Sequence, residues 1–172
     1  VSILIEKNIY ESITKVKGKT KLEVNEPTFN YSTIQYLKFA VKRNELSSVG
    51  KYTSKFEEKI QKYCKTKYCL ATNSGTSALH LVLKGFGIGF KDEVLVPSLT
   101  FAGTVNAIKY CNADPHFVDS NINTNLGIDT FKLEAYLNKN FYFDRGKRLK
   151  NKKTNNFVKA IICVHVYGFP SN

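Results

Sequence analysis

Short apolar runs alternate with longer amphipathic stretches over most of the chain. Apolar runs of this length, bounded by polar or turn-forming residues, predict strands that are buried on both faces of a sheet. The stretches between them carry apolar side chains at helical spacing, which predicts helices. Strands that alternate with helices in this way predict an α/β fold, in which a layered sheet has helices on both faces. The predicted strands cover residues 68–72, 93–97, 115–119 and 158–166, and the predicted helices cover residues 78–83, 104–110 and 130–137.

The residues before this alternation have a different pattern. Apolar residues recur with helical spacing over residues 33–43 and again over residues 53–63, and turn formers at 47–50 separate the two predicted helices. Residues 1–32 are rich in lysine and have weak periodicity. We therefore expect an N-terminal arm over residues 1–32 and a folded unit over residues 33–172.

The composition is that of a globular protein. Of the 172 residues, 42% are hydrophobic and 23% are charged, which argues against wholesale disorder. No apolar stretch approaches a length of about 18 residues, which a membrane-spanning helix needs, so no membrane partner is expected. The sequence starts at Val1, contains no methionine and stops at Asn172, so we expect a piece of a longer protein.

The net charge of +12 raises nucleic acid as a partner. However, only three of the 26 basic residues are arginine and the other 23 are lysine, whereas the planar fork of arginine is what matches bases and phosphates. The densest basic run, residues 145–153, has no interleaved aromatic residues on which bases could stack. We interpret this run as a solvated loop and expect no nucleic-acid partner. A lysine-rich nucleic-acid binder is the alternative, and a steep salt dependence of affinity would identify it.

Cysteine and histidine residues are not spaced as metal ligands. Cys64, Cys69, Cys111 and Cys163 form no CxxC pair, and the three histidines do not stand at ligand spacing from them, so no metal site is expected. Cys111 and Cys163 lie in apolar runs and are interpreted as small core residues. This use of cysteine fits a reducing compartment better than secretion, so we expect a cytoplasmic protein.

The segment Asn73–Ala78 has the composition of an anion-binding turn. Its small residues lead from a predicted strand into a predicted helix, so backbone N–H groups are free at the helix start and the helix dipole favours an anion there. The hydroxyl groups of Ser74, Thr76 and Ser77 add donors. The segment therefore predicts a phosphate site, although it has neither the Walker A pattern nor the GxGxxG pattern. The alternative is a plain helix cap with a glycine turn.

Two further segments follow the ends of predicted strands, where open α/β sheets bind ligands. Phe101 follows the strand at 93–97 and begins a helix, so its ring is able to face a flat cofactor. Packing of this ring in the core is the alternative. His165 lies at the end of the strand at 158–166, where it is able to position a substrate or to titrate; a structural, hydrogen-bonded histidine is the alternative.

Together these segments resemble one family of enzymes. The order and spacing of NSGTSALHLVL, DEVLVPSLTFAGTVNAI, FVD and AIICVHVYGFP resemble the DegT/DnrJ/EryC1/StrS sugar aminotransferases, from about residue 36 to the last residue. The resemblance implies a pyridoxal-phosphate-dependent protein of fold type I. We expect this chain to be the N-terminal portion of its large domain, a three-layer structure with a mostly parallel sheet and helices on both faces.

The resemblance also implies roles for particular residues. Gly75 and Thr76 match the positions that hold the phosphate of pyridoxal 5'-phosphate, and Ser74 is a further phosphate donor. Phe101 matches the aromatic residue that stacks on the pyridine ring of the cofactor.

The same resemblance places the remaining parts of the active site. His165 and Tyr167 match a loop near the substrate, and no catalytic step is assigned to them. The Schiff-base lysine of the family is expected beyond Asn172, so we expect no catalytic residue within this chain.

The implied function is the transfer of an amino group from an amino acid, expected to be glutamate, to a nucleotide-linked keto sugar in cell-surface polysaccharide or glycan biosynthesis. A homodimer is expected of the full-length protein. The insertion between Leu137 and Val158 resembles the branch that serves legionaminic-type sialic acids. Two alternatives stay open: a sugar dehydratase of the same family that uses the pyridoxal or pyridoxamine form of the cofactor, and a non-catalytic remnant of the fold.

Overall fold

The structure, a computed structural model, describes residues 11–12, 15, 27–47, 50–124 and 126–171. The chain divides into two compact units, Val1–Cys64 and Lys65–Asn172, and each unit is described by itself. Most of the predicted N-terminal arm lies outside the described residues, and its division from the rest of the chain stays a prediction. None of the helices in the described part of the chain combines the length and the apolar character needed to cross a bilayer.

Two helices of the first unit confirm the helices predicted from apolar spacing. They are α2 (Tyr31–Lys42) and α3 (Lys51–Cys64). The start of α2 follows from its sequence, because the side-chain oxygen of Asn30 accepts a hydrogen bond from the N–H of Thr33 at 2.9 Å and so caps the helix.

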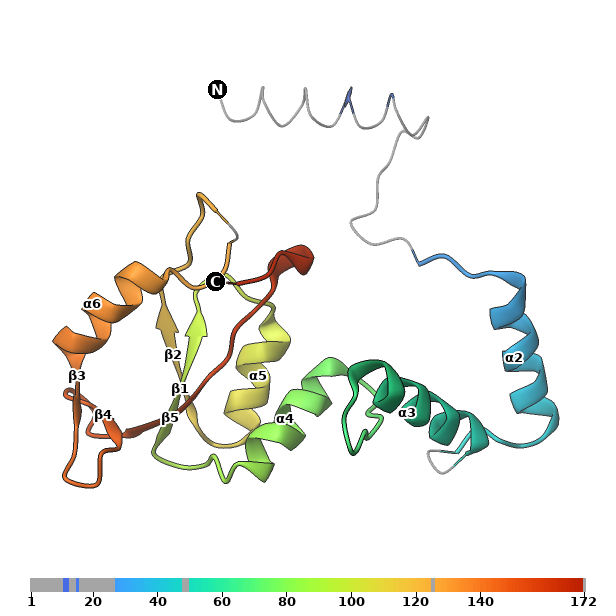
Figure 1. Ribbon diagram of the computed structural model, residues 1–172, viewed down its shortest axis with the longest axis horizontal. Helices are drawn as coiled ribbons and strands as arrows, with labels where there is room; N and C mark the ends of the chain where they lie inside the picture. The colour runs from blue at the N-terminus through green and yellow to red at the C-terminus, as the bar shows by residue number, and fades with distance from the viewer. Residues whose placement is uncertain (1–10, 13–14, 16–26, 48–49, 125, 172) are drawn as a thin grey trace. The chain divides into compact units, whose positions relative to one another are not determined.

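The second unit is built on a sheet with the strand order β2-β1-β5-β4-β3. β2, β1 and β5 are parallel, whereas β4 pairs antiparallel with both β5 and β3. Figure 1 shows α4 and α5 on one side of these strands and α6 on the other. The elements in chain order are α4 (Gly75–Gly85), β1 (Asp92–Pro97), α5 (Ala102–Tyr110), β2 (Asp114–Val118), α6 (Thr130–Asn140), β3 (Phe141–Phe143), β4 (Leu149–Asn151), β5 (Phe157–Ile161) and the 3-10 turn η1 (Val166–Gly168).

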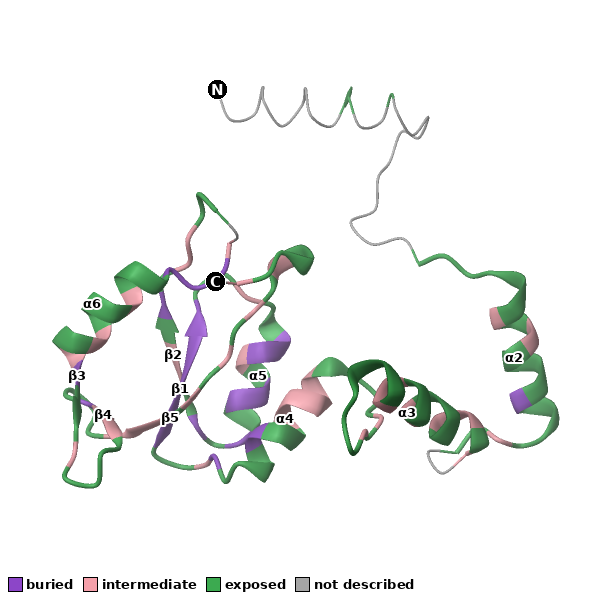
Figure 2. Cartoon of the chain, viewed as in Figure 1, coloured by how far each residue is buried: buried purple, intermediate pink, exposed green. Residues whose placement is uncertain are grey.

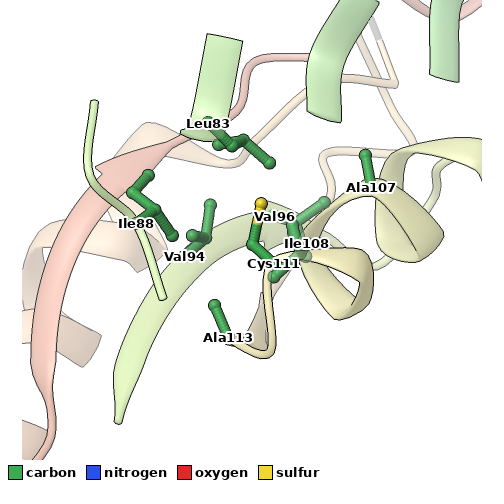
Figure 3. Close-up of a cluster of buried hydrophobic side chains, with 8 residues drawn as sticks. All are labelled: Leu83, Ile88, Val94, Val96, Ala107, Ile108, Cys111 and Ala113. Atoms are coloured by element: carbon green, nitrogen blue, oxygen red, sulfur yellow. The ribbon is translucent and has the colours of Figure 1, made fainter. Parts of the chain in front are cut away.

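Strand β1 lies between β2 and β5, is buried along its whole length and contributes side chains to both faces of the sheet (Figure 2). Because alternate residues of a strand point to opposite faces, Val94 and Val96 pack toward α4 and α5, whereas Leu95 packs toward α6. The cluster on the α4 and α5 side, drawn in Figure 3, contains Leu83, Ile88, Val94, Val96, Ala107, Ile108, Cys111 and Ala113. The cluster on the α6 side contains Leu95, Val118, Ile128 and Phe141. The two clusters confirm the predicted three-layer α/β arrangement.

The apolar run at residues 68–72 forms no strand, so that prediction was wrong. A strand is stable only when its N–H and C=O groups pair with a neighbour, and no described strand lies beside this run. Tyr68 and Leu70 are accordingly 76% and 69% exposed.

The strand predicted at residues 158–166 is shorter than expected. β5 ends at Ile161, and the next residue, Ile162, donates its N–H to the carbonyl of Leu95 on β1 at 2.9 Å. Cys163 lies beyond this point and is exposed, so its interpretation as a core residue was wrong. Cys111 is buried as expected, and its burial raises the pKa of the thiol.

The basic run at residues 145–153 is more ordered than the predicted solvated loop, because residues 149–151 form β4 and pair with β3. Asp144 holds the turn between these two strands: its carboxylate accepts hydrogen bonds from the backbone N–H of Arg148 at 2.9 Å and from the Arg148 guanidinium at 2.8 and 3.1 Å. The Arg148 backbone bond contributes most to lowering the pKa of Asp144. The guanidinium also lies 4.2 Å from the centre of the Phe157 ring.

Truncation of a fully buried core residue tests the layer assignment. Ile108 lies on α5, has no exposed surface and belongs to the same buried cluster as Val94 and Val96 of β1. Ile108→Ala is therefore expected to lower the free energy of unfolding by about 2–4 kcal/mol. Urea denaturation of the chain measures this loss. Val82→Ala is the matched control: Val82 on α4 is 52% exposed, and its truncation is expected to change the stability by less than about 0.5 kcal/mol. Equal losses in the two variants would contradict the assignment of the core.

Candidate functional site

The start of α4 presents two free backbone donors. Ser74 caps the helix, because its hydroxyl oxygen accepts a hydrogen bond from the N–H of Ser77 at 3.1 Å. The next two N–H groups along the chain, those of Gly75 and Thr76, have no acceptor within the described part of the chain. A Cβ placed on Gly75 would meet nothing within 4 Å, so space is open beside these donors. The sequence predicted a segment with free donors, with a plain helix cap as the alternative. The structure shows both features in the same segment.

Gly103 brings the start of α4 against the start of α5. A Cβ built on Gly103 would lie 2.5 Å from the Oγ1 of Thr76 and 3.1 Å from the Cδ1 of Phe101. The Thr76 hydroxyl and the Phe101 ring therefore both rest against the backbone at position 103. Only a residue without a side chain permits this approach, and sequence reasoning did not single out Gly103.

Phe101 is an exposed aromatic ring at the carboxyl edge of the sheet. It follows β1, occupies the N-cap position of α5 and makes no side-chain cap bond. The residue is 78% exposed, so the alternative of core packing is wrong. An exposed ring at this edge leaves a flat apolar face available to a ligand.

A cavity of about 370 Å³ joins Phe101 to the segment that follows β5. It brings together three residues that the sequence singled out separately, namely Phe101, His165 and Tyr167. The full lining is Leu99, Thr100, Phe101, Leu126, Val164, His165, Val166 and Tyr167. Sequence reasoning missed Leu126, because it reaches the cavity from the loop after β2 and no local pattern marks it.

Two hydrogen bonds fix the loops around this cavity. The N–H of Leu99 donates to the hydroxyl oxygen of Ser120 at 3.1 Å, which joins the segment after β1 to the segment after β2. The N–H of Ser171 donates to the Nδ1 of His165 at 2.9 Å. His165 is thus the hydrogen-bonded histidine of the alternative interpretation and also a cavity residue. Since Nδ1 accepts, the Nε2 of the neutral ring carries the proton and is able to donate to a ligand.

The described residues contain no cluster of three histidine, cysteine or acidic side chains that could hold a metal ion. All four cysteines are free thiols.

Residues 28–172 match the model of the DegT/DnrJ/EryC1/StrS aminotransferase family. The chain belongs to this family. It is 35% identical over 148 residues to a GDP-perosamine synthase from Caulobacter vibrioides, covering 86% of this chain and 35% of that protein. It is 35% identical over 120 residues to a dTDP-3-amino-3,6-dideoxy-alpha-D-galactopyranose transaminase from Aneurinibacillus thermoaerophilus, covering 70% of this chain and 28% of that protein.

The structural comparison agrees with the sequence comparison. A DegT DnrJ EryC1 StrS aminotransferase from Brucella abortus superposes with a TM-score of 0.66 at 28% identity, covering 78% of this chain and 33% of that structure. The predicted fold, that of the large domain of fold type I aminotransferases, is thereby confirmed. The chain spans about a third of the length of these relatives.

The close approach at Gly103 predicts opposite effects of alanine at two helical glycines. A Cβ on Gly85 meets nothing within 4 Å, so Gly85→Ala is expected to stabilise the chain by up to about 1 kcal/mol through the lower entropy of its unfolded state. Gly103→Ala places a methyl group against Thr76 and is expected to be less stable than Gly85→Ala by at least about 1 kcal/mol. Thermal or urea unfolding measures both variants.

The double variant Gly103→Ala with Thr76→Ala is the control for this explanation. Removal of the Thr76 hydroxyl makes room for the new methyl group, so the two substitutions are expected to couple favourably, by about 0.5 kcal/mol or more. If the effects of the two substitutions on stability were strictly additive, the contact between position 103 and Thr76 would be contradicted.

Proposed function

We propose that this chain supplies the phosphate-binding turn and the ring-stacking residue of a nucleotide-sugar aminotransferase that uses pyridoxal 5'-phosphate. The proposal rests on one contact. At Gly103, the start of α4 with its free N–H donors lies beside the exposed ring of Phe101. A phosphorylated aromatic cofactor needs these two kinds of contact close together.

The start of α4 fits a phosphate group. The free N–H groups of Gly75 and Thr76 point along the helix axis, where the helix dipole also favours negative charge. The hydroxyl of Thr76 adds a donor beside them. The Ser74 hydroxyl caps the helix and donates to the hydroxyl oxygen of Ser77 at 3.0 Å, and we propose that it turns this proton to the phosphate when the phosphate binds. The open space at Gly75 lets a phosphate oxygen approach the backbone closely.

The cavity beside Phe101 fits an aromatic ring. Phe101 would cover one face of the pyridine ring, while Leu99 and Leu126 exclude water from the space beside it. When bound, this cofactor supplies the carbonyl carbon that carries the amino group and the ring that accepts electrons. None of the residues that line the cavity is a lysine, and we assign no catalytic residue in this chain.

We further propose that His165 and Tyr167 contact the substrate, since they line the same cavity as Phe101. The relatives named above carry nucleotide-linked amino sugars in their names, and one is named a transaminase. Their names favour amino transfer over the dehydratase alternative. The acceptor is therefore proposed to be a nucleotide-linked keto sugar and the donor an amino acid such as glutamate, in the biosynthesis of cell-surface polysaccharide. The legionaminic branch stays a prediction.

The proposal extends to the whole protein in two respects. A homodimer would bury apolar side chains that the chain exposes, such as Ile34, Leu37 and Val41, which lie on one face of α2. A cytoplasmic location agrees with the four free thiols, because cysteines of secreted proteins are usually paired.

Binding of pyridoxamine 5'-phosphate tests the proposed half-site. This form of the cofactor has no aldehyde, so it does not react with the 23 lysines of the chain. We expect isothermal titration calorimetry to show binding with a Kd of about 10 μM to 1 mM. Phe101→Ala is expected to raise the Kd about tenfold, because it removes the stacking face. Pyridoxamine without the phosphate is expected to bind at least about tenfold more weakly than the phosphorylated form.

Phe90→Ala is the matched control, because Phe90 is also 78% exposed but does not line the cavity. This variant is expected to keep the wild-type affinity. Equal affinity for the two ligands, together with no effect of Phe101→Ala, would refute the proposed half-site.

A further inference from the structure

A chain of three hydrogen-bonded polar side chains crosses the α6 side of the sheet, outside the cavity described above. Glu93 lies on β1 two residues before Leu95, so it faces the same side, toward α6. The Nδ1 of His116 on β2 lies 3.0 Å from the Oε2 of Glu93, and its Nε2 lies 2.9 Å from the hydroxyl oxygen of Tyr136 on α6. Carboxylate, imidazole and hydroxyl are thus arranged in series.

Glu93 is a buried carboxylate with a complete set of donors. The residue is 2% exposed. Besides His116, it accepts hydrogen bonds from the Nδ2 of Asn151 at 2.9 and 3.2 Å and from the hydroxyl of Thr154. Both of these residues belong to the insertion before β5. A buried carboxylate is stable only when such donors replace water, so the insertion holds the Glu93 charge in place.

The carboxylate of Glu93 determines which ring nitrogen of His116 carries the proton. Since Glu93 only accepts hydrogen bonds, an unprotonated Nδ1 would set two lone pairs against each other at 3.0 Å. The Nδ2 of Asn151 also lies 3.4 Å from Nδ1, but it donates at the shorter distance of 2.9 Å to Glu93. Nδ1 therefore carries a proton, which it donates to Glu93. In the neutral ring Nε2 then carries the lone pair, and the hydroxyl of Tyr136 donates to it. The phenol proton of Tyr136 therefore points to the Nε2 of His116, and the carboxylate of Glu93 orients the His116 ring.

We propose that Tyr136 is a nucleophile toward small neutral acyl donors and that His116 is its general base. The Tyr136 oxygen would form a bond to the acyl carbon while the Nε2 of His116 takes the phenol proton, and the Glu93 carboxylate stabilises the imidazolium that results. The bond from the acyl carbon to its leaving oxygen then breaks, and the leaving group takes the proton from His116. The product is an acyl ester on Tyr136, with no change of oxidation state. Glu93 is a positioning residue in this scheme.

A small cavity supplies the place for the acyl donor. It has a volume of about 280 Å³ and includes Tyr136, which is 38% exposed. Its one ammonium group, on Lys132, is already paired with the carboxylates of Asp119 at 3.5 Å and Asp129 at 4.0 Å. One ammonium group against two carboxylates leaves a net negative charge, so the cavity disfavours an anion and accepts an uncharged donor. The remaining lining is apolar and aromatic: Phe117, Val118 and Leu133.

Acetylation of the whole chain by p-nitrophenyl acetate tests the proposal. Mass spectrometry of peptides follows the rate at each tyrosine, and Tyr63 is the internal reference because it is 86% exposed. We expect Tyr136 to react at least about tenfold faster than Tyr63. His116→Gln is expected to lower the rate at Tyr136 to that of Tyr63, while the rate at Tyr63 stays unchanged.

The pH profile separates general-base assistance from a structural role. Among the described residues, those within hydrogen-bond reach of the His116 ring are Glu93, Tyr136 and Asn151, and the amide of Asn151 carries no ionisable group. The rate at Tyr136 is expected to depend less on pH than the rate at Tyr63, because His116 takes the phenol proton of Tyr136 whereas an unassisted phenol reacts as its phenolate. Glu93→Gln is expected to change the Tyr136 profile into one like that of Tyr63.

Two results would overturn the proposal. One is a wild-type rate at Tyr136 no greater than the rate at Tyr63, and this comparison decides the matter even where a variant fails to fold. The other is a folded His116→Gln variant, verified by circular dichroism, in which Tyr136 still reacts at the wild-type rate.

Discussion

The second unit depends on one strand whose two faces are both removed from water. Val94 and Val96 are buried against apolar side chains on one side of β1, and Leu95 is buried against others on the opposite side. α4 and α5 cover the first side and α6 covers the second, so the three layers follow from the burial of β1. The parallel neighbours β2 and β5 point their carboxyl ends in the same direction as β1. The loops that leave these ends therefore gather at one edge, which is where the candidate cofactor site lies.

The geometry of that site depends on the absence of a side chain. α4 and α5 begin close together because Gly103 leaves room for the Thr76 hydroxyl and the Phe101 ring. The exposed ring and the free donors of α4 are unfavourable features for a fold taken by itself, since apolar surface stays in water and backbone groups lack partners. Such features are expected where a ligand completes the structure, and membership of an aminotransferase family agrees with that expectation.

The insertion before β5 has a physical role in the fold. Burial of the Glu93 carboxylate costs free energy unless donors surround it. Asn151 and Thr154 provide two of these donors and His116 provides a third. The network joins β1, β2, the insertion and α6 on the side of the sheet away from α4 and α5. A charge that is this well held also orients the ring of His116, and the reactivity proposed for Tyr136 depends on that orientation.

Local sequence patterns predicted the layers, the approximate positions of the helices and several residues of the candidate site. Helical and strand periodicity located α3, α4, β1, α5 and β2, because each of these elements buries one stripe or a continuous run of apolar residues. The small residues at 73–78 marked the helix cap and the free donors of the proposed phosphate turn, since capping and free N–H groups are properties of a few neighbouring residues. Which strands pair with one another was decided only by the tertiary structure. The run at 68–72 has strand composition but no neighbour to pair with, and residues 149–151 form a strand because β3 lies beside them. Gly103, Leu126 and the chain from Glu93 to Tyr136 likewise depend on contacts between residues far apart in sequence. A single sequence records such residues without recording that they meet, and only the tertiary structure brings them together.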